Sequence, residues 1–277
     1  MPLFICPTPI GNLEDVTLRV LRILKECDVI FAEDTRRTRI LLNKYGIERK
    51  KLYSYNKNNW KKRIPLLKEL LSEGKSISLV SDAGTPGISD VGAEAIKFCI
   101  EEGFKIEVLP GPTAFVPALL LSGITPHPFI FYGFLPSQKG KRLKTLKGLR
   151  DLPFTLVFYE SPHRIYESLC DILEMLGDRK ACLVREITKL HEEALRGYLS
   201  ELLAKAKDLK GEIVLVVEGN ENLSKGDVKE NIEERITSLL KKGLTSKEVV
   251  KKLSEEIKLP KREIYKMVLK LKRGDKD

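Results

Sequence analysis

The sequence predicts an α/β fold made of two α/β domains and a small C-terminal helical module. Residues 1–109 alternate short apolar runs with amphipathic stretches, a βαβα rhythm typical of a mainly parallel sheet with helices on both faces. A second α/β block starts after Pro110-Gly111-Pro112, which cannot continue a strand. After Gly219-Asn220 the chain is lysine-rich and shows no strand pattern. We therefore expect domains at 1–112, 113–223 and 224–277.

The individual elements follow from the spacing of the apolar residues. In the first block, short apolar runs predict strands at 3–6, 29–32, 51–55, 77–80 and 105–109. Between them, apolar residues at helical spacing, such as Val20, Ile23 and Leu24, predict helices at 17–27, 37–45, 60–72 and 91–102. In the second block we expect strands at 129–132, 155–159, 181–185 and 213–218, and we place the basic stretch 139–144 in a loop.

The tail from residue 225 onward holds 16 Lys and Arg against 10 Asp and Glu, a net charge of +6. Residues 244–248 offer a helix N-cap, and the apolar residues after them recur at helical spacing: Val249, Val250, Leu253 and Ile257. A turn at 259–261 precedes a second amphipathic stretch at 262–272. Two short helices around a tight turn predict a helix-turn-helix-like module.

Composition limits the class of protein. The 277-residue chain is 42% hydrophobic, and no apolar run approaches the roughly 18 residues that a membrane span needs. Residues 1–6 lack a basic n-region, so we expect no signal peptide and a cytoplasmic protein. The five cysteines are widely spaced and form no C-x-x-C, which predicts reduced core thiols and no metal site. The net charge of +10 favours an anionic partner, with nucleic acid first.

Four loops carry the functional signal. Residues 81–87 follow a predicted strand and precede a helix, the position where α/β proteins bind ligands, and Gly84 and Gly87 let the backbone approach a ligand closely. Comparable loops occur at 7–12, 110–114 and 159–165. We expect the four to line one cleft between the α/β domains. None matches G-x-G-x-x-G or a P-loop, which argues against nicotinamide cofactors and nucleoside triphosphates and leaves a nucleotide-like ligand held by backbone groups.

Longer motifs in both blocks resemble one family. They are PTPIGNLEDVTLR (7–19), AEDTRRT (32–38), SDAGTPGISD (81–90), PGPTAFVPALLLSG (110–123), GFLP (133–136), YESPHRI (159–165), REITKLHEE (185–193) and GEIVLVVEG (211–219). With them the chain resembles the tetrapyrrole-methylase-fold, or class III, S-adenosylmethionine methyltransferases, and its basic tail fits their RNA branch. The resemblance implies a homodimer that methylates the ribose 2′-hydroxyl of cytidine 1402 in 16S rRNA of the 30S subunit. Tetrapyrrole enzymes usually carry Gly-Asp-Pro where this chain has Gly84-Thr85-Pro86, which points away from porphyrin substrates.

The resemblance also implies where S-adenosylmethionine would bind. It would lie folded in the interdomain cleft, bordered by Pro9, Ile10 and Gly11. The loop around its amino-acid part would supply Asp82, Gly84, Thr85, Pro86 and Ile88. Thr113 and Ala114 would contact its middle, and its adenine side would face Tyr159, Gly211, Glu212 and Ile213.

Methyl transfer to a ribose hydroxyl needs in-line positioning and a base. The sequence does not choose among the candidates for the base or its supporting groups, which are Glu33, Asp34, Arg36, Glu160, His163, Arg185, Glu186 and Lys189. If residues 185–193 are extended, Arg185, Lys189 and His191 share a face that suits a phosphate. For RNA phosphates we expect contacts from Lys139, Lys141, Arg142 and Lys144, and we expect the tail to grip the substrate.

Two other functions stay open. An enzyme of the same fold could act on a small tetrapyrrole-type substrate, although the basic tail and the Gly84-Thr85-Pro86 loop argue against it. A non-catalytic nucleic-acid-binding protein would explain the charge but would leave the four loops without a role.

Overall fold

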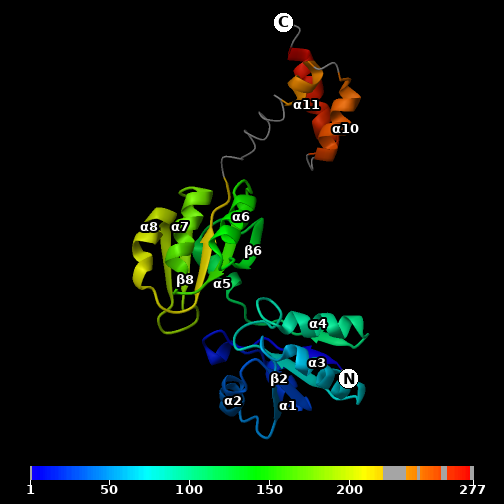
Figure 1. Cartoon of the computed structure of the whole chain (residues 1–277), viewed down its shortest axis with the longest axis vertical. Helices are drawn as coiled ribbons and strands as arrows, with labels where there is room; N and C mark the ends of the chain where they lie inside the picture. Colours follow the sequence, from blue (N-terminus) through cyan, green and yellow to red (C-terminus); the bar gives the residue numbers. More distant parts are fainter. Residues whose placement is uncertain (1, 221–234, 242–243, 257–260, 275–277) are drawn as a thin grey trace. The chain divides into compact units, whose positions relative to one another are not determined.

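The computed structural model describes residues 2–220, 235–241, 244–256 and 261–274. The chain forms two compact units. The first comprises Met1–Leu149 with Phe154–Glu218 and holds both sheets; the second comprises Arg150–Pro153 with Gly219–Asp277 and holds the C-terminal helices (Figure 1).

The first sheet contains five parallel strands in the order β3-β2-β4-β1-β5. Its strands are β1 (Leu3–Ile5), β2 (Val29–Ala32), β3 (Lys51–Ser54), β4 (Ile77–Val80) and β5 (Ile106–Val108). The helices between them are α1 (Leu18–Glu26), α2 (Thr35–Lys44), α3 (Trp60–Ser72) and α4 (Gly92–Glu101). The predicted parallel sheet is therefore confirmed.

Both faces of this sheet are covered by helices. On one face, residues of α1 and α2 such as Val20 and Leu41 join the same apolar cluster as Ile30 of β2. On the other face, residues of α3 and α4 such as Leu67 join the cluster that holds Phe31. Because neither face meets water, all four residues of β2 and of β4 are buried, and Ser78 of β4 is the one polar residue among these eight.

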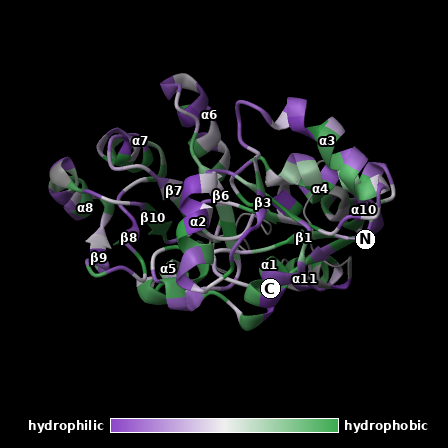
Figure 2. Cartoon of the chain, turned by 90° about the horizontal axis from the view of Figure 1, so that it is seen from below, coloured by the Kyte–Doolittle hydropathy of each residue, from purple (hydrophilic) through white to green (hydrophobic). Residues whose placement is uncertain are grey.

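The second sheet is mixed, with the order β6-β7-β10-β8-β9. Strands β6 (Phe129–Phe134) and β7 (Thr155–Glu160) are parallel, whereas β8 (Lys180–Arg185), β9 (Glu193–Tyr198) and β10 (Ile213–Val217) join by antiparallel pairing. Helix α5 (Phe115–Ser122) packs on one face, and α6 (Lys139–Leu149), α7 (Ile165–Leu176) and α8 (Leu199–Lys205) pack on the other. Outer helices such as α7 carry both hydrophilic and hydrophobic residues (Figure 2).

Three expectations about this half were wrong. Strand β9 was not predicted; it pairs with β8 as a hairpin. Residues 186–192 form the turns of that hairpin, so 185–193 is not one extended segment, and Glu186 and Thr188 have positive φ angles of 52° and 64°. The basic stretch 139–144 is not a loop, because it forms the first turns of α6.

The second unit contains a helical segment at 235–241 and helices α10 (Ser246–Glu256) and α11 (Lys261–Gly274), which share one apolar cluster that includes Leu253 and Ile264. Thr245 caps α10: its N–H donates to Glu248 Oε2 (2.7 Å), and its Oγ1 accepts from the Glu248 N–H (3.4 Å). The predicted N-cap and helices are confirmed. Ile257 and the predicted turn around residue 260 lie outside the described residues.

Two further properties bear on the class of protein. Within the described ranges, none of the helices combines the length and apolar character required to cross a membrane. The five cysteines are free thiols, and Cys6, Cys27, Cys99 and Cys182 are buried.

Candidate functional site

Three loops at the carboxyl ends of the first sheet's strands are joined by hydrogen bonds. Thr8 and Gly84 exchange two backbone hydrogen bonds of 2.9 Å, and the Thr8 hydroxyl donates to the Ser81 carbonyl (3.0 Å). The Thr85 hydroxyl donates to the Pro112 carbonyl (2.9 Å). Gly84 has φ +78°, a left-handed conformation that glycine adopts without strain. The loops after β1, β4 and β5 therefore form one rigid wall.

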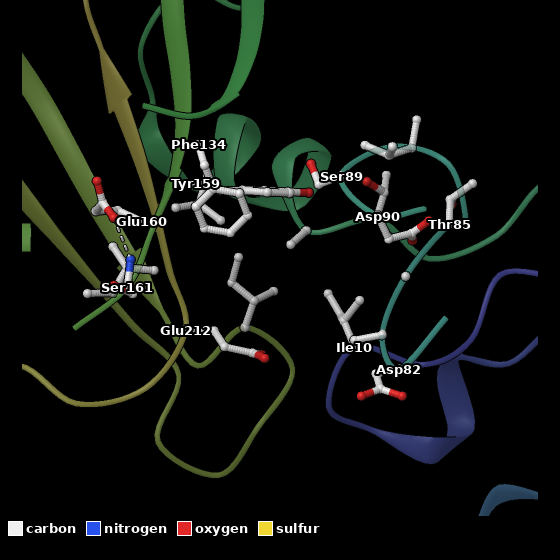
Figure 3. A pocket seen from close by; sticks show the side chains of 18 of the residues that line it. Ile10, Asp82, Thr85, Ser89, Asp90, Phe134, Tyr159, Glu160, Ser161 and Glu212 are labelled. Atoms are coloured by element: carbon white, nitrogen blue, oxygen red, sulfur yellow. Dashed lines mark hydrogen bonds between the residues drawn. The ribbon is translucent and has the colours of Figure 1, made fainter. Parts of the chain in front are cut away.

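This wall faces the second sheet across a cavity of about 370 Å³. In Figure 3, Ile10, Asp82 and Thr85 come from the first sheet's loops, and Tyr159, Phe134 and Glu212 lie opposite them. Twelve of the predicted site residues line the cavity: Ile10, Glu33, Asp82, Gly84, Thr85, Ile88, Thr113, Ala114, Tyr159, Glu160, Glu212 and Ile213.

The other predicted cofactor-site residues lie behind the lining. Pro9 and Pro86 are buried, and Pro86 borders a separate small cavity of about 10 Å³. Gly11 packs against the β8–β9 hairpin, where a Cβ on it would lie 2.5 Å from Lys189 Cγ. Gly211, with φ +91°, packs against the Glu186 side chain so closely that a Cβ there would overlap it. Gly11 and Gly211 therefore allow their loops to pack closely against the β8–β9 hairpin, and they support the cavity without lining it.

Eight residues that line the cavity were not predicted as site residues: Ala83, Ser89, Asp90, Phe134, Ser161, Pro162, Ile187 and Val214. Each lies inside one of the motifs through which the chain resembles the methyltransferase family. The signal that could have found them was therefore the motif as a whole, because loop residues next to a ligand-binding residue tend to share its cavity.

Two carboxylates hold the end of β2 against the loop after β4. The Asp82 N–H donates to Glu33 Oε2 (3.2 Å), and the Asp34 N–H donates to Asp82 Oδ1 (2.8 Å). Burial raises the pKa of Glu33 above its usual range, and the nearby charges of Asp82 and Asp90 raise it further, while the hydrogen bond from Asp82 opposes them. Glu33 is thus a cavity-lining carboxylate with enhanced basicity.

Asp34 is placed differently from its neighbour. It caps α2 by accepting from the Arg36 N–H (2.8 Å), and it also pairs with the Arg36 guanidinium, with Nη2 2.6 Å from Oδ2. The hydrogen bonds from the Arg36 side chain and backbone lower the pKa of Asp34 to about 2. A carboxylate held in this way is a poor proton acceptor, and neither residue lines the cavity.

Glu160 lines the cavity, but its oxygens are already engaged. Oε2 accepts from the Ser168 hydroxyl (2.6 Å), Oε1 accepts from the Ser161 N–H (2.9 Å), and Arg164 Nε lies 3.7 Å from Oε1. These contacts tie the end of β7 to the start of α7. His163, in the turn before α7, is exposed and does not line the cavity.

The three candidates in the β8–β9 hairpin form ion pairs. Arg185 Nε lies 2.6 Å from Glu193 Oε2, across the hairpin. Lys189 Nζ lies 3.0 Å from both Glu186 Oε1 and Glu212 Oε2. Partial burial acts to lower the pKa of Lys189, but the hydrogen bonds to both carboxylates outweigh it and raise the pKa. Lys189 thus fixes the position of Glu212 at the edge of the cavity and is not positioned with Arg185 to bind one phosphate.

Tyr159 forms the floor of the cavity on the side of the second sheet. Burial raises the pKa of its hydroxyl, partly offset by hydrogen bonds with Thr113 and with the backbone at the start of α5. Its ring packs edge-on against Phe131 and Phe134, at centroid distances of 4.9 and 5.6 Å. The site therefore offers aromatic surface beside a polar loop.

The lining has a strong charge bias. Five carboxylate residues contribute to it: Glu33, Asp82, Asp90, Glu160 and Glu212. Among the described residues that line it there is no lysine, arginine or histidine. A cationic ligand therefore fits this cavity better than an anionic one.

The basic stretch of α6 is divided between surface and core. Lys139, Lys141 and Lys144 are exposed. Arg142 is 3% exposed, and its Nε donates to Asp171 Oδ2 at 2.6 Å. The expectation that Arg142 contacts RNA was therefore wrong, because its guanidinium is buried and forms an ion pair with Asp171.

Comparison with known proteins connects this geometry to a family. Residues 2–203 match the family of Tetrapyrrole (Corrin/Porphyrin) Methylases. The chain is 44% identical over 270 residues to Ribosomal RNA small subunit methyltransferase I of Bacillus subtilis, covering 95% of this chain and 92% of that protein. It is 49% identical over 221 residues to the protein of that name from Thermotoga maritima, covering 79% of this chain and 99% of the relative.

Solved structures share the fold. Uroporphyrin-III C-methyltransferase of Thermus thermophilus, complexed with S-adenosylhomocysteine, gives a TM-score of 0.57 at 22% identity, over 79% of this chain and 97% of that one. The methyltransferase CobJ gives a TM-score of 0.61 at 20% identity, over 79% of this chain and 94% of that one. The predicted tetrapyrrole-methylase fold is confirmed.

Proposed function

This chain belongs to the tetrapyrrole methylases and, within them, to the family of ribosomal RNA small subunit methyltransferase I, and from that premise we propose its reaction. It transfers a methyl group from S-adenosylmethionine to the ribose 2′-hydroxyl of cytidine 1402 in 16S rRNA of the small subunit. A ribosomal substrate would also account for the expected cytoplasmic location.

The observation that carries the proposal is the acidic cavity beside glycine-rich loops. S-adenosylmethionine bears a sulfonium, an ammonium group and one carboxylate, so its net charge is +1. A lining with five carboxylate residues and, among the described residues that form it, no basic side chain suits such a ligand. The cavity volume of about 370 Å³ lies within the range of small-molecule sites. The residues that would hold the cofactor are those of the loop wall, with Gly84 and Thr85, and those opposite, with Tyr159 and Ile213.

The chemistry asks for alignment and for removal of one proton. When bound, S-adenosylmethionine supplies a methyl group that is already activated as an electrophile. The ribose oxygen forms the new C–O bond as the S–CH₃ bond breaks, the sulfur keeps the bonding electron pair, and the hydroxyl proton passes to a base. The protein's part is to hold oxygen, carbon and sulfur in line and to accept that proton.

For the base we propose Glu33. It lines the cavity, and burial raises its pKa, so it combines access with basicity. The other candidates are less suited: Asp34 is paired with Arg36, and Lys189 is held by two carboxylates. We propose that Glu160 and Lys189 keep the cavity in shape through their neighbours.

The substrate would be held outside the cavity. We propose that the exposed Lys139, Lys141 and Lys144 contact phosphates and that the module at 224–277 grips the subunit, in keeping with the division 1–112, 113–223 and 224–277. The match to the Thermotoga maritima relative includes 99% of that protein but only 79% of this chain. About a fifth of this chain therefore has no counterpart in that relative. We expect truncation after Leu223 to leave a folded enzyme with normal cofactor affinity and a raised KM for 30S subunits. Earlier melting with loss of cofactor binding would instead make the tail a structural cap.

We also propose a homodimer. Helix α5 is almost wholly apolar, and it leaves Val116 42% and Leu120 69% exposed. A second copy could cover this surface. Light scattering of the purified chain tests the proposal, and a monomer mass at micromolar concentration would refute it.

One experiment separates the candidate functions. The enzyme is incubated with S-adenosylmethionine labelled in the methyl group and with naked 16S rRNA, 30S subunits or a porphyrin precursor. We expect label in RNA, on the ribose oxygen of one cytidine. Label in the porphyrin would identify a tetrapyrrole methylase, and no transfer to any substrate would favour a non-catalytic RNA-binding protein.

A further inference from the structure

Helix α2 presents an unusually basic surface. Its ten residues include four cations, Arg36, Arg37, Arg39 and Lys44, and no acidic residue. All four are exposed, while Thr38, Leu41 and Leu42 hold the opposite side in the core. In the described part of the chain, Arg39 and Lys44 have no carboxylate within salt-bridge distance. We call the exposed side, with Ile40 between these cations, the α2 basic face.

The charges in the first turn of α2 have the sign that disfavours a helix, whereas Lys44 in the last turn has the favourable sign. Cations stabilise the last turn of a helix and are unfavourable in the first, where the backbone dipole is positive. Arg36 and Arg37 occupy the first turn, which contains no acidic residue. Asp34 compensates Arg36 with a hydrogen-bonded ion pair. Arg37 lies 3.7 Å from Asp82 and stays 62% exposed, so it remains open to a second anion.

The α2 basic face begins at the edge of the cavity. Asp82 lines the cavity, accepts a hydrogen bond from the Asp34 N–H, and carries the contact with Arg37. Glu33, the residue before Asp34, also lines the cavity. Because α2 follows a parallel strand, it runs from this edge of the sheet toward the opposite one, over about 15 Å for ten residues. Its first cations therefore lie beside the site and Lys44 lies farthest from it.

This arrangement supplies what the acidic cavity lacks. An RNA strand would be repelled by a lining of carboxylates and needs cations at the rim to bring a ribose to it. Ile40, one turn after Arg36, is 63% exposed and offers an apolar surface between the cations. Phosphate-binding cations around an apolar side chain match a single strand, whose bases are unstacked and available for contact.

We propose, on the premise of the function proposed above, that the α2 basic face binds the single-stranded RNA that flanks the methylated ribose. Arg37 and Arg39 contact its phosphates, and Ile40 packs against a base. Arg36, which the sequence analysis counts among the catalytic candidates, then belongs to the RNA-binding surface. This surface fixes which ribose enters the cavity, and it takes no part in the chemical step.

The test compares two double variants with equal loss of charge. Arg37→Gln/Arg39→Gln removes two cations from the α2 basic face. Arg22→Gln/Lys25→Gln removes two exposed cations from α1, which covers the same face of the sheet. Affinity for a single-stranded 16S rRNA fragment containing the target cytidine is measured against salt by fluorescence anisotropy. Calorimetry with S-adenosylmethionine and thermal melting serve as controls.

We expect the α2 variant to flatten the log-log salt slope by about 1.4, from about 0.7 for each single-strand phosphate contact. It should also raise KM for RNA without changing kcat or cofactor affinity, and the α1 variant should behave as wild type. Equal losses in both variants, or an unchanged slope in the α2 variant, would overturn the inference. The binding assay needs no catalysis, so it tests the α2 basic face even if the wild-type enzyme fails to methylate RNA. Failure to methylate RNA would refute the proposed function but not the RNA-binding role of this face.

Discussion

The buried pair of Arg142 and Asp171 allows a sharp test of how α6 is held. Arg142 Nε and Nη2 both lie 2.6 Å from Asp171 Oδ2, and Nη1 donates to the carbonyls of Pro136 (3.3 Å) and Ser137 (3.0 Å). Both charged side chains are 4% exposed. The guanidinium thus joins α6, α7 and the loop after β6. Replacing Arg142 with alanine leaves a buried carboxylate without its main partner.

The expected cost follows from that burial. Removing one partner of a buried ion pair destabilises a protein by about 3–5 kcal/mol, because the remaining charge stays desolvated. For a chain of this size each kcal/mol lowers the melting temperature by about 2–4 °C. We therefore expect Arg142→Ala to melt about 6–20 °C below wild type. Arg142→Met/Asp171→Leu, which removes both charges and keeps the volume, should recover most of the loss.

The assay is thermal melting followed by circular dichroism, with RNA affinity measured in parallel below the melting range. Lys141→Ala is the matched control, since Lys141 is an exposed cation of the same helix and should change stability by less than about 0.5 kcal/mol. A wild-type melting temperature for Arg142→Ala, combined with a flatter salt dependence of RNA binding, would refute the reasoning. Arg142 would then be a surface phosphate ligand.

Three further predictions concern the first sheet and its loops. Glu33→Gln should lower kcat by about 10²–10⁴-fold and remove the acidic limb of the pH profile of kcat/KM. Because burial raises the pKa of Glu33, that limb should lie above about pH 4.5 in the wild type, and a variant that retains the limb would exclude Glu33 as the base. Gly11→Ala should weaken cofactor binding and lower the free energy of unfolding by about 1–3 kcal/mol, because the new Cβ would lie 2.5 Å from Lys189 Cγ. The control Gly140→Ala should not lower it, because among the described residues no atom outside its own helix lies within 4 Å of the position of its Cβ. Tyr55→Phe should raise the free energy of unfolding, measured in urea, by up to about 1 kcal/mol, because the buried Tyr55 hydroxyl has no hydrogen-bond partner among the described residues. A lower free energy of unfolding would instead indicate a water that bridges this hydroxyl in the small cavity beside it.

Local patterns were enough to predict the first sheet. Strands such as β4 are short, apolar except for one serine, and bounded by turn residues, so each can be recognised within about ten residues of sequence. The loop 81–87 was recognisable for the same reason, since its glycines and proline act on the local backbone. Strand β9 lacks this signature: its sequence EALRGY does not alternate, and no residue of it is fully buried. It forms because β8, which pairs with β10 on one side, leaves its other edge free for β9, and this is tertiary information.

The charged residues show the same limit more strongly. Arg142, Leu146 and Leu149 recur at helical spacing, so the pattern places Arg142 on the side of α6 that faces the core. Its partner Asp171 is 29 residues away, and nothing in the local sequence connects the two. The Lys189–Glu212 pair likewise joins residues 23 positions apart. Spacing therefore indicates which side of a helix a charged residue occupies, but not the distant partner that pairs with it, and that partner decides whether its charge is free for a ligand.

Charge acts at two distances in this protein, and the signs differ. The net charge of +10 belongs to the surface and attracts RNA over about a Debye length, roughly 8 Å at physiological salt. The carboxylates of the cavity act at contact distance on whatever enters it. Under the proposed function, transfer of the methyl group turns a sulfonium into a neutral sulfide, so the lining stabilises the cofactor more than the product. Affinity for S-adenosylmethionine relative to S-adenosylhomocysteine should then fall when Glu212, at the rim of the cavity, is replaced by glutamine. An unchanged ratio would mean that the loops recognise shape alone.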